Sequence, residues 1–309
     1  MIFMYYSGVD KMPLWRAAVL GHFPDAEFRV WPDVGDKSEI DYAIVWRPPE
    51  GELKSYPNLK AILSLGAGID GILCDPDLPR DVPIVRLVDR CLTEGMSEYV
   101  LYWTLHFHRK FDRYLEMSAE RNWGNLLQDD THEKRVGILG LGELGGDAGR
   151  KLAAIGFDVA AWSRTPKSVD GITSFSGADA LAPFLARTEI LVCLLPLTAE
   201  TEGIIDAGLL AGLPEGAVVI NCARGGHVVD DDLLAALDSG HIHAAVLDVF
   251  HKEPLADDHA FWGHPKVTVT PHMASLTVPS SASEFIAENV RLIEQGKAPL
   301  NTVDLDRGY

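Results

Sequence analysis

The sequence predicts an α/β protein with two parallel-sheet domains, and three observations favour this class. The chain has 309 residues, which at roughly 150 residues per domain suggests about two domains. Short apolar runs alternate with helical stretches, a pattern typical of β-α-β units and a mostly parallel sheet. A glycine-rich turn at residues 140–145 lies between an apolar run and a helical stretch in mid-chain, where a second series of this alternation begins.

The first third of the chain is expected to form a sheet. Residues 13–23 predict a helix with a Pro close to its first turn. Residues 96–121 contain neither Pro nor Gly and predict one long helix. The expected strands are short, apolar and bounded by Pro, Gly or Asp, and they cover residues 2–6, 28–31, 42–46, 61–65 and 84–88.

The second series of elements follows the same alternation. Its expected strands cover residues 136–139, 158–162, 190–195, 218–222, 244–249 and 267–270. Its expected helices cover residues 144–155, 179–185, 230–238 and 279–295. The last helix follows the final strand and could return to the first domain. We therefore expect two doubly wound domains: a discontinuous, flavodoxin-like substrate domain of residues 1–96 plus 276–309, and a Rossmann cofactor domain of residues 97–275.

Charge and composition exclude several classes of protein. Lys and Arg number 27 against 45 Asp and Glu, a net charge of −18, so neither nucleic acid nor an anionic membrane is an expected partner. No apolar stretch approaches the ~20 residues that cross a bilayer, and the N-terminus lacks the features of a signal peptide. The four cysteines form no CxxC pair. We expect a cytoplasmic protein with reduced thiols and, since the histidines show no ligand grouping, no metal site.

The turn at residues 140–145 has the form GxGxxG and predicts a dinucleotide-binding loop. It follows an expected strand and opens an expected helix, which is the context that the motif requires. Gly140 would allow the tight turn, Gly142 the approach of a pyrophosphate, and Gly145 the packing of helix on strand. The helix N-terminus would bind the anion. The residues expected to contact the cofactor here are Gly140, Leu141, Gly142, Glu143, Leu144 and Gly145.

The strand after this loop predicts which dinucleotide binds. NAD-binding domains place an acidic residue about 20 positions past the loop, where it holds the ribose hydroxyls. Here Ser163, Arg164 and Thr165 occupy that place, and Lys167 follows closely. A guanidinium and hydroxyl groups suit a 2′-phosphate. We therefore expect a preference for NADP(H), with NAD(H) as a possible cofactor.

Three polar segments follow the expected strands of the second domain, at residues 221–226, 248–254 and 271–275. The carboxyl ends of the strands are where open α/β sheets bind ligands. The segments contribute Arg224, a carboxylate and His272. Hydride transfer to a ketone requires a cation that orients and polarises the substrate, and a proton source for the new alkoxide. The three segments therefore supply the parts that hydride transfer to a ketone requires.

With these motifs the chain resembles the D-isomer-specific 2-hydroxyacid dehydrogenases over nearly its whole length. The resemblance rests on the GxGxxG loop, on Asn-x-Ala-Arg-Gly at residues 221–225, on Asp-Val-Phe-x-x-Glu-Pro at residues 248–254, and on the late Pro-His pair. Residues 45–49, 65–70, 162–165 and 306–309 are similar to the branch of the family that reduces glyoxylate and hydroxypyruvate. The resemblance implies NADPH-dependent reduction of these acids to glycolate and D-glycerate.

The resemblance also implies roles for individual residues. Arg224 would bind the substrate carboxylate and polarise the keto oxygen. His272 would donate the proton during reduction, and Glu253 would pair with it and favour its protonated form. Asp248 would lie near the nicotinamide carboxamide. The other implied contacts are Trp46, Gly66, Ala67 and Gly68 for the substrate, and Leu195, Pro196, Cys222 and Ala223 for the cofactor.

The resemblance further suggests a homodimer, in which the region around Trp123 reaches the partner subunit. Two alternatives stay open. One is an NAD-linked dehydrogenase for a larger D-2-hydroxy acid. The other is a nucleotide-sensing binding protein like the corepressors that share this fold. The corepressors can retain the residues that correspond to Arg224, Glu253 and His272 of this chain. Turnover of hydroxypyruvate would therefore separate the two classes of protein.

Overall fold

The computed structural model describes residues 1–8 and 12–305. The chain divides into two compact units, one of residues 1–92 with 276–309 and the other of residues 93–275. The first boundary falls four residues before the expected one at 96/97. A helix crosses this boundary, since α3 (Arg90–His108) begins at Arg90, so the chain offers no loop there that would mark it.

The first unit contains a parallel sheet of five strands in the order β2-β1-β3-β4-β5. This is the flavodoxin-like order, which agrees with the fold class expected for this domain. The strands are β1 (Ile2–Tyr6), β2 (Glu27–Val30), β3 (Tyr42–Val45), β4 (Ala61–Ser64) and β5 (Ile84–Val85). They are paired in parallel throughout.

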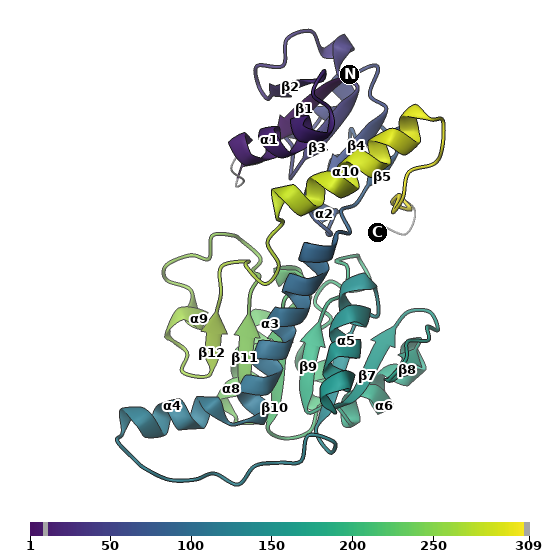
Figure 1. Ribbon diagram of the computed structural model, residues 1–309. Helices are drawn as coiled ribbons and strands as arrows, with labels where there is room; N and C mark the ends of the chain where they lie inside the picture. The colour runs from purple at the N-terminus through teal and green to yellow at the C-terminus, as the bar shows by residue number, and fades with distance from the viewer. Residues whose placement is uncertain (9–11, 306–309) are drawn as a thin grey trace. The chain divides into compact units, whose positions relative to one another are not determined.

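Two helices from opposite ends of the chain cover one face of this sheet, α1 (Met12–His22) and α10 (Pro279–Glu294) (Figure 1). Trp15 and Val19 of α1 and Ile286 of α10 pack on Phe3 and other strand residues. The α10 helix therefore completes the core of the first sheet. The other face is covered around η2 (Leu53–Ser55) and α2 (Asp70–Leu73), and η1 (Lys37–Glu39) lies in the same unit.

The second unit contains a seven-stranded parallel sheet in the order β12-β11-β10-β9-β6-β7-β8. Counted from β6, this is the Rossmann order 3-2-1-4-5-6 with one further strand. The strands are β6 (Arg135–Leu139), β7 (Asp158–Ser163), β8 (Ile172–Ser176), β9 (Ile190–Cys193), β10 (Ala217–Asn221), β11 (Ile242–Leu247) and β12 (Val267–Val269). The order reverses between β6 and β9, which is where such sheets bind ligands.

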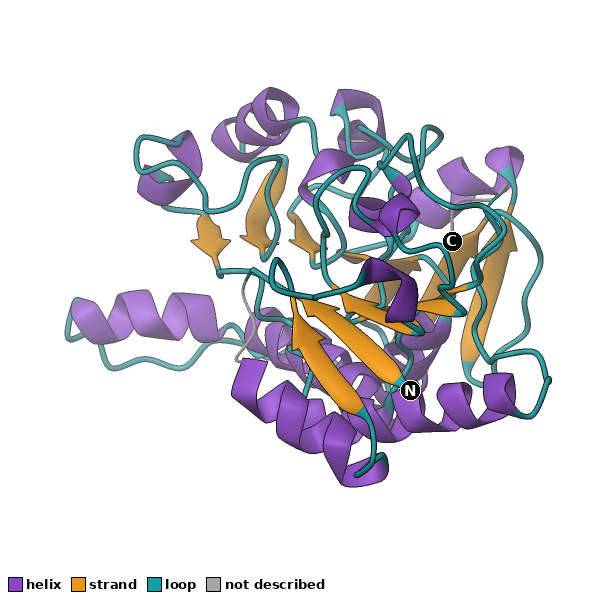
Figure 2. Ribbon diagram, turned by 90° about the horizontal axis from the view of Figure 1, so that it is seen from above, coloured by secondary structure: helices purple, strands orange, loops and turns teal. Residues whose placement is uncertain are grey.

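Helices cover both faces of the seven-stranded sheet (Figures 1 and 2). On one face lie α3 and α5 (Glu143–Ile155), whose apolar side chains join one core cluster. The other face is covered by α6 (Leu181–Ala186), α7 (Ala207–Ala211), α8 (Asp230–Asp238) and α9 (Ala260–Gly263). Two short 3-10 turns, η3 (Ala178–Ala180) and η4 (Gly225–His227), complete the unit. No helix among the described residues is long and apolar enough to cross a membrane.

The prediction of a single helix over residues 96–121 is wrong, because the structure has two helices in this region. The α3 helix ends at His108 and α4 (Phe111–Ala119) begins after Lys110. Lys110 has φ of 58°, a left-handed conformation that no helix continues through. The α4 helix projects from the second unit (Figure 1), and none of its residues is buried.

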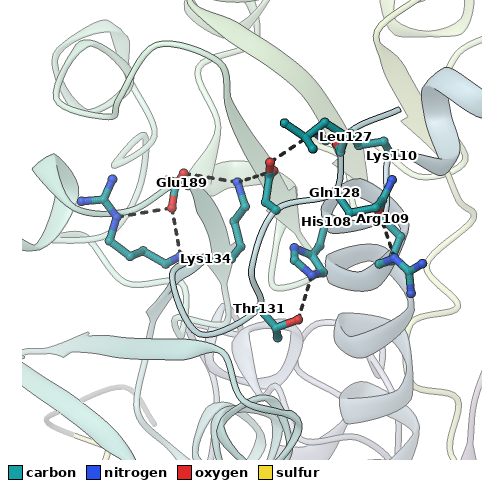
Figure 3. A network of polar contacts seen from close by, with 10 residues as sticks. His108, Arg109, Lys110, Leu127, Gln128, Thr131, Lys134 and Glu189 are labelled. Carbon is teal, nitrogen blue, oxygen red and sulfur yellow. Dashed lines mark hydrogen bonds and ion pairs between the residues drawn. The ribbon is translucent and has the colours of Figure 1, made fainter. Parts of the chain in front are cut away.

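Polar contacts fasten the segment that follows α4 back onto the second unit (Figure 3). Lys134 bonds to Glu189 at 3.2 Å and so links the start of β6 to the start of β9. Side chains at and just after the end of α3 bind the same segment: His108 to Thr131, Arg109 to Gln128, and Lys110 to Leu127 and Asp129. The base of the projection is thus anchored at several points.

Candidate active site

The dinucleotide loop connects β6 to α5 in the conformation that its glycines predict. Gly140 has φ of 105°, and a Cβ atom there would lie 2.7 Å from the carbonyl oxygen of Leu194. A Cβ atom on Gly145 would lie 2.0 Å from the carbonyl oxygen of Gly140. Both positions therefore require glycine, one for backbone conformation and one for close packing.

The N-terminus of α5 fits a pyrophosphate. Gly142 is the N-cap, and no side chain caps it. A Cβ atom built on Gly142 would meet nothing within 4 Å, so this glycine faces open space, whereas Gly140 and Gly145 face backbone. Unpaired N–H groups at a helix N-terminus and the helix dipole both favour an anion. The residues present here accordingly fit the diphosphate of a dinucleotide.

The loop after β7 carries the residues that predict NADP(H). Ser163 is 6% exposed, and its hydroxyl donates to the carbonyl oxygen of Thr165 at 2.8 Å. This bond forms a turn in which Arg164, Thr165 and Lys167 are exposed. Lys167 Nζ donates to the carbonyl oxygen of Leu141 at 2.7 Å, so the β7 loop is bonded directly to the glycine loop. Cationic groups and hydroxyls therefore stand where an NAD-specific domain would have an acid.

The Arg224 loop is held by buried side chains. Asn221 is fully buried, and its Nδ2 donates to the carbonyl oxygen of Arg224 at 2.9 Å. The ring of His227, also fully buried, lies 3.1 Å from the same oxygen and 3.3 Å from the carbonyl oxygen of Pro196. The Arg224 side chain is half-buried, and its Nη1 donates to the carbonyl oxygen of Ala223 at 2.7 Å.

Gly225 brings the Arg224 loop against the loop that carries Glu253. A Cβ atom on Gly225 would lie 1.9 Å from the carbonyl carbon of Phe250 and 2.3 Å from the nitrogen of His251. Real Cβ atoms essentially never approach so closely. Glycine is therefore required here for the two loops to touch.

Glu253 and His272 form a pair. The Nδ1 atom of His272 lies 2.8 Å from Oε2 of Glu253, and the two side chains are 33% and 20% exposed. The other carboxylate oxygen of Glu253 accepts a bond from the N–H of Phe250 at 3.1 Å. Since a carboxylate accepts, Nδ1 carries the proton of this bond. Nε2 is then the ring nitrogen that faces away from Glu253.

The backbone of His272 is left-handed, with φ of 52°. Asp248 stabilises this turn: its carbonyl oxygen accepts from the His272 N–H at 2.8 Å, and its carboxylate accepts from the N–H groups of Met273 and Ala274 at 2.9 Å each. Asp248 is 1% exposed, and burial raises its pKa above the usual range of a carboxyl. Its carboxylate is thus engaged with the His272 loop.

The remaining sequence-predicted cofactor residues lie around the same sheet edge. Leu195 and Pro196 follow β9, and Cys222 and Ala223 follow β10, beside the point where the strand order reverses. Cys222 is 5% exposed, and its Sγ lies 3.7 Å from the carbonyl oxygen of Cys193. Burial raises the pKa of the Cys222 thiol well above its ordinary value, so this cysteine is a packing residue and no nucleophile.

The predicted substrate residues of the first unit also lie together. A Cβ atom on Gly66 would meet the Trp46 ring at 2.4 Å, so this glycine makes room for the indole. Gly66 itself is buried, and its N–H faces the Ser64 hydroxyl at 3.3 Å. Ala67 and Gly68 are more exposed. They are the better candidates for binding a carboxylate through backbone N–H groups.

Some residues of this site had no role assigned to them from the sequence. Asn221 and His227 fix the Arg224 carbonyl, and Thr270 binds Asp248 with its hydroxyl at 2.6 Å. Asn221 and Thr270 each stand at or next to the end of a strand, a position that could have indicated them. Tyr99, which bonds to Thr270 at 2.7 Å, lies within a helix, where its spacing marks only a core position.

Comparison with known proteins agrees with this architecture. Residues 101–274 match the family described as D-isomer specific 2-hydroxyacid dehydrogenase, NAD binding domain. The chain therefore belongs to the D-isomer-specific 2-hydroxyacid dehydrogenase family. It is 43% identical, over 99% of both chains, to a protein of Serratia proteamaculans named glyoxylate/hydroxypyruvate reductase A.

Two solved structures have the same fold over the whole chain. A D-isomer specific 2-hydroxyacid dehydrogenase from Xanthobacter autotrophicus Py2, in complex with NADPH and MES, has a TM-score of 0.96 and 44% identity, covering 100% of this chain and 99% of that one. An NADPH-dependent glyoxylate/hydroxypyruvate reductase from Sinorhizobium meliloti, in complex with NADP and sulfate, has a TM-score of 0.94 and 39% identity with the same coverage. The expected family and fold class are thus confirmed.

Proposed function

We propose that the protein reduces glyoxylate and hydroxypyruvate to glycolate and D-glycerate with NADPH. The bond between His272 and Glu253 at 2.8 Å, beside the Arg224 loop, is the observation that carries this proposal. The names of two relatives support it: the Serratia protein is called a glyoxylate/hydroxypyruvate reductase, and the Sinorhizobium protein an NADPH-dependent one. When bound, NADPH would supply the hydride.

His272 is the proposed proton donor. Its Nδ1 proton is bonded to Glu253, which leaves Nε2 as the ring nitrogen that would give a proton to the reacting oxygen. Reduction leaves an alkoxide that must gain one proton, and a positioned acid that supplies it contributes typically about 10²–10⁴-fold to the rate. In oxidation the neutral ring would take the proton back.

Arg224 is the proposed cation for the substrate. Its guanidinium can form paired bonds to a carboxylate, and its carbonyl is held by Asn221 and His227. Because the chain carries a net charge of −18, an anionic substrate requires local positive charge. Backbone N–H groups of Ala67 and Gly68 would bind the carboxylate in addition, and Trp46 would line the pocket.

The cofactor preference rests on Arg164. A charge-assisted hydrogen bond contributes roughly 1.5–3 kcal/mol, or about ten- to 150-fold in affinity. Arg164→Ala should therefore raise the KM for NADPH by a factor in this range and leave NADH kinetics nearly unchanged. Arg150→Ala, which removes another exposed arginine of this unit, is the matched control. Equal efficiency with NADPH and NADH in the wild-type protein would overturn the assignment.

One assay tests the function as a whole. Initial rates would be measured with NADPH and with NADH against glyoxylate, hydroxypyruvate, pyruvate and phenylpyruvate. The proposal expects the highest kcat/KM with NADPH and the two small acids. Faster turnover of phenylpyruvate with NADH would instead identify a dehydrogenase for a larger D-2-hydroxy acid, and nucleotide binding without turnover would identify a sensing protein.

We further propose that the protein is a homodimer held through the second unit. The projecting α4 and its neighbours expose large apolar side chains: Tyr102 at 59%, Phe111 at 53%, Leu115 at 64%, Trp123 at 101% and Leu127 at 87%. The segment that carries Trp123 and Leu127 is fastened at its base (Figure 3). Such an anchored apolar surface is typical of an interface between proteins, and a second copy of the chain is the proposed occupant.

Light scattering tests the dimer directly. The wild-type chain should give about twice the mass of the 33.8 kDa monomer at micromolar concentration. Leu115→Asp should shift the protein toward the monomer, whereas Leu14→Asp, at an exposed leucine of the first unit, should not. A monomeric wild-type chain would contradict the proposal.

A cytoplasmic location without nucleic-acid partners is also proposed. All four cysteines are free, as reducing compartments favour. The net charge of −18 disfavours nucleic acid. Fractionation that recovers the protein with cytoplasmic markers is the expected result.

A further inference from the structure

We propose that the Tyr99 hydroxyl positions His272 through a buried chain of hydrogen bonds. The intermediates are Thr270 and Asp248. The inference deepens the proposed function and rests on it, because it assumes that His272 is the proton donor. Tyr99 would be a positioning residue, since its described bond is to Thr270 and its effect on the reaction would pass through other side chains.

The direction of the chain follows from the donors and acceptors. Thr270 donates its hydroxyl proton to Oδ1 of Asp248 at 2.6 Å. A hydroxyl has one proton to donate, so the bond of 2.7 Å between Tyr99 and Thr270 has Tyr99 as its donor. Tyr99 is 8% exposed and lies on α3. The α3 helix is thereby hydrogen-bonded to Thr270, the residue that follows β12.

Asp248 transmits the constraint to the histidine. Its carboxylate accepts from the N–H groups of Met273 and Ala274, and its carbonyl accepts from the N–H of His272. These bonds hold the left-handed His272 residue, with φ of 52°, from both sides. Left-handed backbone is unfavourable for any residue with a Cβ atom. If the Asp248 side chain rotates, the His272 imidazole should no longer be oriented for its hydrogen bond to Glu253.

The charged and titratable groups around Asp248 predict a pH signature. Burial raises the pKa of Asp248, and the bond from Thr270 and the charge of His272 act in the opposite direction. The thiol of Cys222 and the phenol of Tyr99 also face this carboxylate. Loss of the Thr270 hydroxyl should raise the pKa of Asp248 further. Protonation would then disrupt the turn at a higher pH.

The experiment compares four single variants in the full chain. Tyr99→Phe removes only the hydroxyl, Thr270→Val removes the intermediate hydroxyl, and Thr270→Ser retains it. Tyr56→Phe is the matched control: Tyr56 is 3% exposed and its hydroxyl donates to the carboxylate of Glu52 at 2.5 Å in the first unit. For each variant, kcat, the KM for NADPH, the thermal midpoint and the pH–rate profile for hydroxypyruvate would be measured.

The expected results separate positioning from stability. Tyr99→Phe should lower kcat about five- to tenfold, the effect of one buried hydrogen bond, with the KM for NADPH unchanged. Tyr56→Phe should lower the thermal midpoint about as much as Tyr99→Phe does, but it should leave kcat unchanged. In Thr270→Val the acid limb of the pH profile of kcat should move to higher pH. Thr270→Ser, which retains the hydroxyl, should have the acid limb of the wild type. The double variant Tyr99→Phe/Thr270→Val should be no slower than Thr270→Val.

Two results would be decisive against the inference. If the wild-type chain reduces hydroxypyruvate and Tyr99→Phe retains its kcat, Tyr99 has no positioning role while the proposed function stands. If Thr270→Val has the acid limb of the wild type, the chain through Asp248 is refuted by a second route. A wild-type chain that binds NADPH and reduces no keto acid would refute the proposed function itself.

Discussion

Gly225→Ala should separate the two halves of the proposed catalytic apparatus. Gly225 follows Arg224, and its Cα faces the backbone of Phe250 and His251 in the loop that carries Glu253. The new methyl group would lie 1.9 Å from the Phe250 carbonyl carbon, where ordinary contacts begin at 3.4 Å. The two loops must therefore part by about 1.5 Å. Neither obstacle is the flexible end of a side chain, so no rotamer change relieves the clash.

The cost to activity follows from this displacement. Misplacement of catalytic groups by about 1 Å can lower the rate about 10²-fold, and overpacking typically destabilises by about 1–3 kcal/mol. Steady-state kinetics with hydroxypyruvate should therefore show a loss in kcat/KM of about 10²-fold or more. Circular dichroism should show a lower thermal midpoint with the native spectrum retained below it.

The neighbouring glycine supplies the control. A Cβ atom on Gly226 would meet the side-chain carbons of Leu197 at 3.2 Å, and that flexible side chain can move. Gly226→Ala should retain kcat/KM within a few-fold. If Gly225→Ala were as active as Gly226→Ala, the contact between the two loops would not position Arg224, and the reasoning would be wrong.

Three further variants test the acid/base pair and the scaffold. His272→Ala should lower kcat about 10²–10⁴-fold with little change in the KM for NADPH; near-native turnover would exclude His272 as the donor. Glu253→Gln removes the carboxylate that accepts from Nδ1 of His272 at 2.8 Å, so kcat should fall while the KM for NADPH stays unchanged. For Glu189, burial favours the neutral acid, but the N–H of Arg135 and the ammonium of Lys134 outweigh it and lower the pKa. The resulting stability is present above the unfolded pKa near 4.3 and is lost as pH falls through the lower folded pKa. Glu189→Gln should therefore lower the thermal midpoint at pH 7, and the difference from wild type should vanish in acid.

The sheets were largely predictable because buried parallel strands are continuous apolar runs. The β8 strand escaped prediction, since it is an edge strand of mixed residues with no buried side chain and therefore lacks that signal. The α7 and α9 helices are single short turns with too little periodicity to detect. The break between α3 and α4 at Lys110 depends on a backbone conformation that lysine does not favour. No local sequence pattern predicts this break.

The candidate site could be proposed from the sequence where the chemistry demands particular residue types. The glycine loop, Arg224, Glu253 and His272 follow strands, and the order of the strands brings their ends to one edge. Contacts made by ordinary residues were not predictable. That Asp248 bonds to the His272 loop depends on how two loops fold against each other, and nothing in its sequence neighbourhood distinguishes this role from a contact with the cofactor.

The left-handed conformation of His272 sets stability against activity at one residue. Glycine adopts φ of 52° freely, whereas this conformation costs a residue with a Cβ atom roughly 1–2 kcal/mol of folding free energy. Selection for thermal resistance alone would thus favour glycine in place of the proposed proton donor, and kcat would fall as it should in His272→Ala. Stabilisation of this enzyme by directed evolution therefore requires selection for turnover in every round.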